Sequence, residues 1–266
     1  MSEIGNIDGG SVERPLTARS VVASTLLGTT PPTLPGWLLV RAGTLFGIAE
    51  GTVRTALSRM VAAGELTTAD GHYALAGALV ARQARQAESR QAEVRPWDGG
   101  WTMAVVRAEP RTTGQRTDLR AAASALRLAE LREGLWLRPD NLDPDRLPEQ
   151  AGVLAEQCVR FEARPDVPSA GTLAASLWDL DRWAVRADAL RARLAALVPA
   201  LEAGDTAGLA PGFVLSASVL RLTQADPLLP PDLLPPDWPG AGLRADYERY
   251  DRAYQALLRA WFRQQS

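Results

Sequence analysis

Between residues 17 and 75 the chain has three short helical patterns, followed directly by a two-residue turn signal, Asp70-Gly71. The first pattern begins at Thr17, which is a good N-cap residue, and the third ends at Gly64. Asp-Gly between two short alternating segments favours a hairpin with a type I′ turn. Helix, helix, turn, helix and hairpin is the order of a winged helix-turn-helix domain, so we predict that fold here.

The third helix, which begins near residue 50 and ends at Gly64, takes the position of the recognition helix in this order. Its apolar residues recur at the spacing of a helix packed on a small core, at Val53, Ala56, Leu57, Met60 and Val61. The opposite face carries hydroxyl groups and arginines without an acidic residue, at Thr52, Arg54, Thr55, Ser58 and Arg59. Such groups suit phosphates and base edges, so we predict that these five residues contact DNA, Thr52 through a phosphate. The alternative is an ordinary helical bundle whose polar face is only solvated.

The overall charge does not attract nucleic acid by itself, because 29 basic residues stand against 31 acidic residues. All the basic residues are arginines, whose planar guanidinium can bind a phosphate or a guanine edge through two hydrogen bonds. Between Arg14 and Arg95 arginines outnumber acidic residues, whereas acidic residues predominate in the rest of the chain. Basic charge is therefore concentrated in the region that we predict to bind DNA.

The residue types that are missing argue against an enzyme. His72 is the only histidine and lysine is absent, which excludes a histidine metal cluster, a histidine-containing triad in the core and a lysine-containing phosphate loop. The single cysteine, Cys158, excludes an internal disulfide and fits a reducing cytoplasm. We find no apolar run of membrane-span length and no signal peptide pattern. We therefore expect a cytoplasmic protein that needs no membrane, metal or cofactor.

Residues 96–170 have the pattern of a small α+β domain. Residues 101–108 and 134–139 are apolar runs of strand length, and a helical pattern and a further strand pattern follow them. Between the two runs we predict one amphipathic helix, whose inner face contains Leu119, Ala122, Ala123, Leu126 and Leu131.

The last region, residues 171–266, is mostly helical in pattern. One long helix rich in alanine and leucine is predicted from residue 172 to residue 197, and another between residues 241 and 264. The segment between them, DPLLPPDLLPPDWPG, is too rich in proline for a helix or a central strand. Its leucines and Trp238 predict a segment that lies across a core.

Five segments in the same order resemble the PaaX family, bacterial repressors of phenylacetic-acid catabolism. They are GIAEGTVRTALSRMVAAGEL, WDGGWTMAVV, GLWLRPDNL, LWDLDRWAVRADAL and DPLLPPDLLPPDWPG, and the resemblance extends from residue 16 to about residue 262. It implies a ferredoxin-like central domain, similar to small CRISPR-associated nucleases, that serves for dimerisation. The expected class is α+β, with a disordered tail (1–14), a winged helix-turn-helix domain with a connecting helix (15–95), a ferredoxin-like domain (96–170) and a helical C-terminal domain (171–266).

The resemblance also implies a function. A PaaX-like chain would be a homodimeric repressor on double-stranded operator DNA, released by an acyl-CoA effector such as phenylacetyl-CoA. Two positions depart from that pattern: the wing around Asp70 lacks arginine, and Ala49 stands where a serine or aspartate would cap the recognition helix. A related regulator of another pathway is therefore an alternative.

We expect the effector to bind outside the first 90 residues, because the polar face of the first domain is committed to DNA. An acyl-CoA needs an apolar cavity for its acyl group and cationic donors for its phosphates. Both kinds of group occur between residues 97 and 138, at Trp97, Trp101, Arg107, Trp136 and Arg138. Trp136 and Arg138 are two residues apart in a predicted strand and so share a face. The alternative is that Trp136 packs in the core and Arg138 caps a turn.

The competing function is a metal-dependent nuclease that uses the central domain. Its candidate metal ligand is Asp98, which lies just before the first predicted strand of that domain. Asp98 has no partner carboxylate nearby in the sequence, and a turn residue in WDGG is the alternative role.

Overall fold

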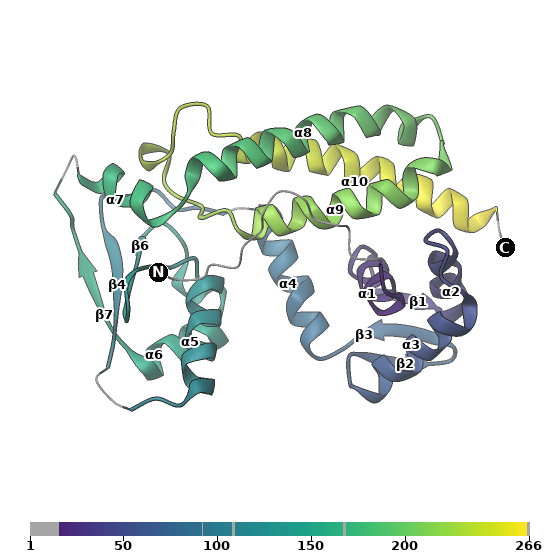
Figure 1. The fold of residues 1–266 in the computed structure, drawn as a ribbon, viewed down its shortest axis with the longest axis horizontal. Coiled ribbons are helices and arrows are strands. Elements are labelled where there is room, and N and C mark those ends of the chain that lie inside the picture. Colours follow the sequence, from purple (N-terminus) through teal and green to yellow (C-terminus); the bar gives the residue numbers. More distant parts are fainter. Residues whose placement is uncertain (1–15, 92, 108–109, 167–168, 265–266) are drawn as a thin grey trace. The chain divides into compact units, whose positions relative to one another are not determined.

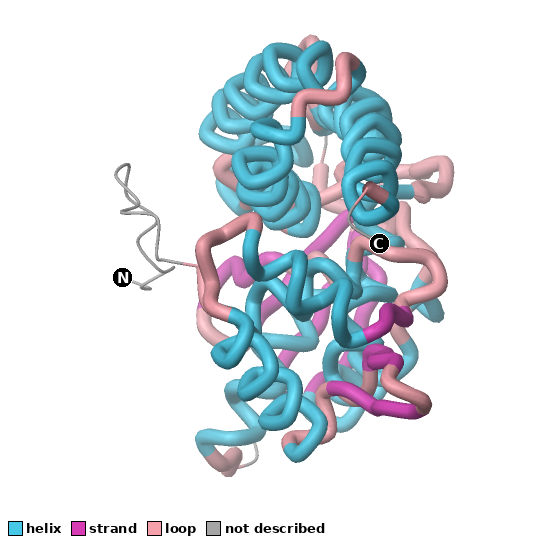
Figure 2. The backbone as a smooth tube through the Cα atoms, turned by 90° about the vertical axis from the view of Figure 1, so that its right-hand side faces the viewer, coloured by secondary structure: helices cyan, strands magenta, loops and turns pink. Residues whose placement is uncertain are grey.

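The computed structural model describes residues 16–91, 93–107, 110–166 and 169–264 (Figure 1). It confirms the α+β class: the chain is 61% helical with two small sheets in the described part, and helices predominate in Figure 2. The chain divides into two compact units, the first made of Met1–Ala87, Gly204–Gly212 and Gln255–Ser266, the second of Glu88–Ala203 and Phe213–Tyr254. The segment 1–14, which we predicted to be disordered, lies outside the described residues.

Three helices and a three-stranded sheet form the winged helix-turn-helix of the first unit (Figure 1). The helices are α1 (Ala18–Leu27), α2 (Gly36–Thr44) and α3 (Glu50–Ala62). The antiparallel strands lie in the order β1 (Thr33–Pro35), β3 (His72–Leu75) and β2 (Leu66–Ala69). One apolar core joins all three helices to the sheet, with Val22, Leu26, Leu39, Val53, Leu57, Met60 and Leu66 among its buried residues.

Local signals set the ends of these elements, as the sequence predicted. The side chain of Thr17 caps α1 by accepting the backbone N–H of Ser20 at 3.1 Å. Asp70 and Gly71 have φ angles of 50° and 74°, and a type I′ turn requires positive φ at both positions. The predicted hairpin is therefore confirmed.

The segment TTPPTLPG before the second helix has the proline content of a loop, but it contains β1. Its central residue, Leu34, pairs with Tyr73 of β3. β1 is an edge strand of its sheet, where a proline such as Pro35 does not interrupt a ladder between two neighbours. Because proline is rare in strands, the local sequence pattern does not indicate a strand here.

The central part of the second unit has the βαββαβ order of a ferredoxin-like fold. Its elements are β4 (Trp101–Val106), α5 (Thr113–Ala125), β5 (Ala129–Arg132), β6 (Leu135–Pro139), the 3-10 turn η1 (Pro144–Arg146), α6 (Pro148–Gln157) and β7 (Cys158–Ala163). The strands are antiparallel in the order β5-β6-β4-β7. Helices α5 and α6 lie side by side against one face of this sheet (Figure 1).

Between the apolar runs 101–108 and 134–139 the sequence predicted one helix, but the structure has a helix followed by the strand β5. Helix α5 ends at Ala125, and the chain turns at Arg127, whose φ is 61°. Leu131, which we placed on the inner face of the helix, lies in β5 with 45% of its surface exposed. The stretch LRLAEL fits helix and strand equally well, and pairing with β6 decides between them.

The two faces of the central sheet carry separate apolar cores. Ala104 and Trp136 pack with α5 and α6, against Leu119, Ala123, Leu126 and Leu154. Trp101 and Leu137 lie on the opposite face and pack against Ala170, Ala174, Leu180, Leu229 and Leu233. The central strands β4 and β6 are thus covered on both faces, whereas most of β7 is exposed.

The remaining helices are α4 (Ala78–Gln91), α7 (Ser169–Leu177), α8 (Leu180–Glu202), α9 (Leu209–Gln224) and α10 (Gly240–Arg263), with 3-10 turns η2 (Thr206–Gly208) and η3 (Pro231–Leu233). The long helix predicted from residue 172 is two helices, because the carboxylate of Asp179 caps a new helix by accepting the N–H of Arg182. The proline-rich segment lies on a core as predicted, and Trp238 stacks on Trp183 with ring centroids 4.5 Å apart.

One helical run, Thr206–Gln224, is long and apolar enough to be a candidate membrane span by length and composition. We expected no such run from the sequence. A core helix of a globular domain passes the same test, and 44% of this apolar window is buried within the protein. The run alone is weak evidence for a membrane.

Candidate functional site

Helix α3 presents the predicted DNA-contact residues on its solvent face. Val53, Leu57 and Met60 are almost completely buried and fix the rotation of the helix against its core. The residues on the other face are all exposed, namely Thr52, Arg54, Thr55, Ser58 and Arg59. The structure therefore brings these five side chains together, and their contact with DNA stays a prediction.

The hydroxyl groups on this face are oriented by the helix itself. Thr55 donates its hydroxyl proton to the carbonyl of Gly51 at 2.8 Å, and Ser58 donates to the carbonyl of Arg54 at 3.2 Å. A hydroxyl that donates to its own helix keeps its lone pairs for an external donor. These two side chains are therefore suited to accept from base amino groups, such as those of adenine and cytosine in the major groove.

The two arginines of this face differ in their surroundings. Arg54 donates through Nε to Glu50 at 2.8 Å and forms an exposed i,i+4 ion pair with it. The guanidinium of Arg59 has no hydrogen-bond or ion-pair partner among the residues that the structure describes. An exposed pair of the first kind contributes only about 0.3–0.5 kcal/mol, so Arg54 can exchange Glu50 for another anion. Arg59 is the cation of this face that is already free to bind one.

A groove of about 600 Å³ runs beside α3 and reaches the start of α1. Thr52, Thr55 and Arg59 line it from α3, and Thr17, Ala18, Arg19 and Glu65 are among the residues that line its other parts. Arg19 donates to both carboxylate oxygens of Glu65, and this lowers the pKa of Glu65. The sequence did not single out Arg19 or Glu65, which the fold brings to the groove from separate elements.

The wing and the start of α3 agree with the departures seen in the sequence. In the β2–β3 turn the imidazole Nδ1 of His72 lies 3.1 Å from the carbonyl oxygen of Asp70, and the hairpin carries no arginine. Ala49 is the N-cap of α3 and provides no side-chain hydrogen bond to it. The hairpin therefore offers no arginine for DNA, whereas α3 offers Arg54 and Arg59.

The five residues predicted to bind an effector do not line one cavity. Trp101 and Trp97 belong to the core on the α7 side of the sheet, where Trp97 donates its indole N–H to the carbonyl of Gly100 at 2.6 Å. Trp136 and Arg138 lie on the opposite face, and Arg107 is exposed after the end of β4. Trp136 is buried in the core of α5 and α6, as the alternative interpretation predicted.

Arg138 borders a second cavity, of about 400 Å³, between β4, β6, β7 and the segment that leads into α6. This arginine cavity has four arginines in its lining, Arg95, Arg138, Arg146 and Arg160. It also has three acidic residues, Asp140, Asp143 and Glu162, all of them exposed. Its apolar part includes Leu126, Leu128, Leu142, Leu154 and Phe161.

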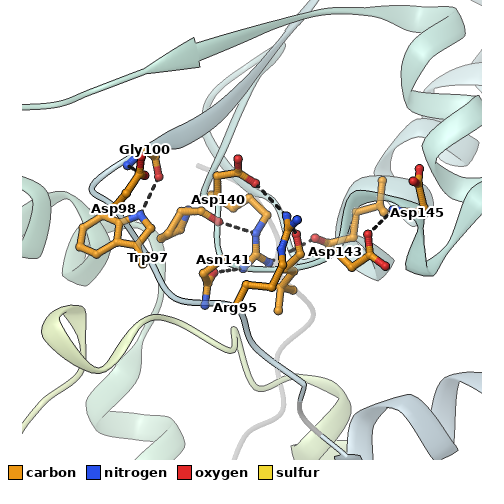
Figure 3. A network of polar contacts seen from close by, with 12 residues as sticks. Arg95, Trp97, Asp98, Gly100, Asp140, Asn141, Asp143 and Asp145 are labelled. Atoms are coloured by element: carbon orange, nitrogen blue, oxygen red, sulfur yellow. Dashed lines mark hydrogen bonds and ion pairs between the residues drawn. The ribbon is translucent and has the colours of Figure 1, made fainter.

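Asp98 is a turn residue whose carboxylate is already bound. One oxygen accepts the N–H of Gly100 at 2.9 Å, and the other forms an ion pair with Arg164 at 2.6 Å. Both contacts lower the pKa of Asp98, the Gly100 hydrogen bond more than the Arg164 contact. In Figure 3 Asp98 lies apart from Asp140, Asp143 and Asp145, and these carboxylates do not converge. Across the described ranges no group of three or more His, Cys, Asp or Glu residues could hold a metal ion. The family matches given below do not favour the nuclease alternative.

Comparison with known families gives three matches along the chain. Residues 17–79 match the model of the PaaX-like protein, residues 94–168 that of the PaaX protein central Cas2-like domain, and residues 178–264 that of the PaaX-like protein C-terminal domain. A solved structure, the uncharacterized protein Rv0674 from Mycobacterium tuberculosis, is 40% identical with a TM-score of 0.71. The match covers 92% of this chain and 98% of that one. No curated protein matches the chain.

Proposed function

Since this chain belongs to the PaaX-like family and is a PaaX-type transcriptional regulator, we propose that it represses an aromatic-acid catabolic pathway of the phenylacetate type. Membership of a regulator family implies DNA binding and a non-enzymatic role. The proposed protein acts in the cytoplasm as a homodimer on operator DNA. The observation that carries the proposal is the exposed polar face of α3, on which the guanidinium of Arg59 has no partner among the described residues.

In the proposed complex α3 lies in the major groove. Arg59 donates to a guanine edge or a phosphate, while Thr55 and Ser58 accept from base amino groups. Thr52, at the start of α3, reaches a phosphate, which the positive end of the helix dipole also favours. Arg54 adds a further phosphate contact once it leaves Glu50.

The proposed effector is an acyl-CoA such as phenylacetyl-CoA, which the family resemblance suggests. It binds outside the first 90 residues and leaves the small core of the winged helix intact. Such a ligand releases DNA by binding more tightly to the dimer geometry that does not fit the operator. The tryptophans and arginines between residues 97 and 138 support a site in the central domain.

The DNA assignment is tested by fluorescence anisotropy with the DNA upstream of the protein's own gene. Arg59→Ala should cost about 1–3 kcal/mol of specific binding and reduce the slope of affinity against salt by about one. Arg132→Ala is the matched control, because Arg132 is exposed in β5, far along the chain from α3. Unchanged affinity in Arg59→Ala overturns the assignment, whereas release of wild-type protein by phenylacetyl-CoA tests the effector separately.

A further inference from the structure

Among the charged residues that line the arginine cavity, the buried one is a cation, Arg138. Arg138 is 6% exposed, whereas Arg95, Arg160 and the three acidic residues of the lining are exposed. A charge buried without a counter-ion is costly unless hydrogen bonds or an opposite charge compensate it. What surrounds Arg138 therefore decides whether the cavity is a site for an anion.

Neutral oxygens surround the guanidinium of Arg138. Its Nε donates to the carbonyl of Pro139 at 2.8 Å, and Nη2 donates to the amide oxygen of Asn141 at 2.6 Å. Its Nη1 donates to the carbonyls of Leu126 and Arg127 at 3.3 Å and 3.5 Å, both longer than most N–H···O hydrogen bonds. A guanidinium has five N–H donors, so Arg138 still has a donor on Nη2 and two weakly bound donors on Nη1.

The carboxylates near the cavity are engaged elsewhere or lie at its rim. Asp140 pairs with Arg95 at 3.6 Å, and Glu88 pairs with Arg146. Asp143 accepts the backbone N–H of Asp145 at 3.1 Å. No carboxylate within the described residues lies at ion-pair distance from Arg138, and Figure 3 shows Asp140 beside Arg95, its ion-pair partner.

Arg138 therefore has hydrogen bonds to neutral oxygens but no carboxylate of the described chain at ion-pair distance. Burial lowers its pKa to about 9, and the guanidinium groups of Arg146 and Arg127 act in the same direction, whereas Asp140 and Glu88 act in the opposite direction from a greater distance. The guanidinium of Arg160, which lines the same cavity from β7, has no hydrogen-bond or ion-pair partner in the described part of the chain. Glu162 lies two residues further along β7 on the same face, but its exposed carboxylate forms no ion pair with Arg160 among these residues.

We propose that the arginine cavity binds a small organic carboxylate, with its charge between Arg138 and Arg160 and its apolar body against Leu126, Leu128 and Leu154. The volume of about 400 Å³ is near the lower end of small-molecule pockets, and it suits a small acid better than an entire CoA thioester. The leucines of the lining explain why an organic acid fits better than inorganic phosphate. This site is independent of the proposed DNA contacts of α3.

The site is tested by isothermal titration calorimetry of the full chain with phenylacetate, the neutral isostere phenylacetamide, inorganic phosphate and phenylacetyl-CoA. Saturable binding of phenylacetate, with no binding of the amide and weaker binding of phosphate, is the expected result. Arg160→Gln should weaken phenylacetate about tenfold or more, the loss of one charge-assisted hydrogen bond. Arg132→Gln, which removes an exposed charge outside the cavity, should leave binding unchanged.

Arg138→Gln should abolish binding, and a thermal melt of that variant shows whether it folds. If it does not fold, Arg160→Gln alone decides the matter. Failure of wild-type protein to bind phenylacetate, equal binding of the amide, or phosphate binding as tight as that of the acid overturns the proposal and leaves Arg138 as a cap for the end of α5. Binding of phenylacetyl-CoA without the free acid also overturns it, while the proposed effector and the DNA assignment stand.

Discussion

The guanidinium of Arg19, in the first turn of α1, donates two hydrogen bonds to the carboxylate of Glu65, which directly follows the glycine that ends α3. The pair joins the two helices at the groove beside the predicted DNA-contact face. It is partly exposed, so it contributes at most about 1 kcal/mol to stability. Its larger effect is electrostatic, because Glu65 neutralises a cation next to the surface that we propose to meet DNA.

Glu65→Gln should therefore strengthen binding to DNA. The change removes a negative charge from the groove and frees Arg19 for a phosphate, which steepens the slope of log affinity against log salt by about 0.9. Fluorescence anisotropy across a salt series measures both effects. Glu133→Gln is the control for the change in net charge, because Glu133 is exposed in the turn between β5 and β6. An equal gain in both variants would show that Arg19 makes no phosphate contact.

The protein should be a dimer at micromolar concentration. One recognition helix covers only a few base pairs, so specific affinity requires two half-sites read by two copies. We expect the contacts between copies to come from residues 96–170 and the C-terminal helices. Multi-angle light scattering with a dilution series measures the mass, and a monomer throughout the series contradicts the prediction.

The carboxylate of Asp98 should titrate below its ordinary range. Arg164→Gln should raise the pKa of Asp98 but not restore it fully, because the larger cause, the N–H of Gly100, remains. Since the pKa is lowered by folding, the contribution of this turn to stability is present above the ordinary value of 3.8 and is lost as the pH falls through the lowered value. NMR titration of the carboxyl carbon measures the shift, and identical curves for both proteins refute the role of Arg164.

Trp136→Ala should destabilise the central domain by about 3–5 kcal/mol, the usual loss for a large aromatic residue in a core. Trp136 is 8% exposed and packs between the sheet and α5. Trp37 is 47% exposed, so Trp37→Ala should change stability by only about 0.5 kcal/mol. Differential scanning calorimetry compares the two variants. A small loss for Trp136→Ala would mean that this face of the sheet is loosely packed.

The winged helix-turn-helix could be predicted because its signals are local. The cap at Thr17, the turn at Asp70-Gly71 and the apolar spacing of α3 each depend on residues close together in the chain. β1 and β5 could not be predicted in this way. Each is short, and each becomes a strand by pairing with a neighbour, Leu34 with Tyr73 and Ala129 with Leu137.

The five residues of the predicted effector site do not lie together, because the sequence does not fix the register between strands. Trp136 pairs with Ala104, and Trp101 is an odd number of residues from Ala104, so the two tryptophans point to opposite faces. Alternation within a single strand correctly placed Trp136 and Arg138 on one face. The arginine cavity adds Arg95, Arg146 and Arg160 from other segments, and only the folded chain brings them to Arg138.

The packing of the proline-rich segment determines which pieces of this chain can fold alone. Leu229 and Leu233 cover the face of the central sheet that carries Trp101 and Leu137, together with residues of α7. A truncated protein that stops before α7 would expose this apolar face to water and would be prone to aggregate. We therefore expect the central sheet and the segment near residue 230 to fold together, and a cut of the chain between them to destabilise both.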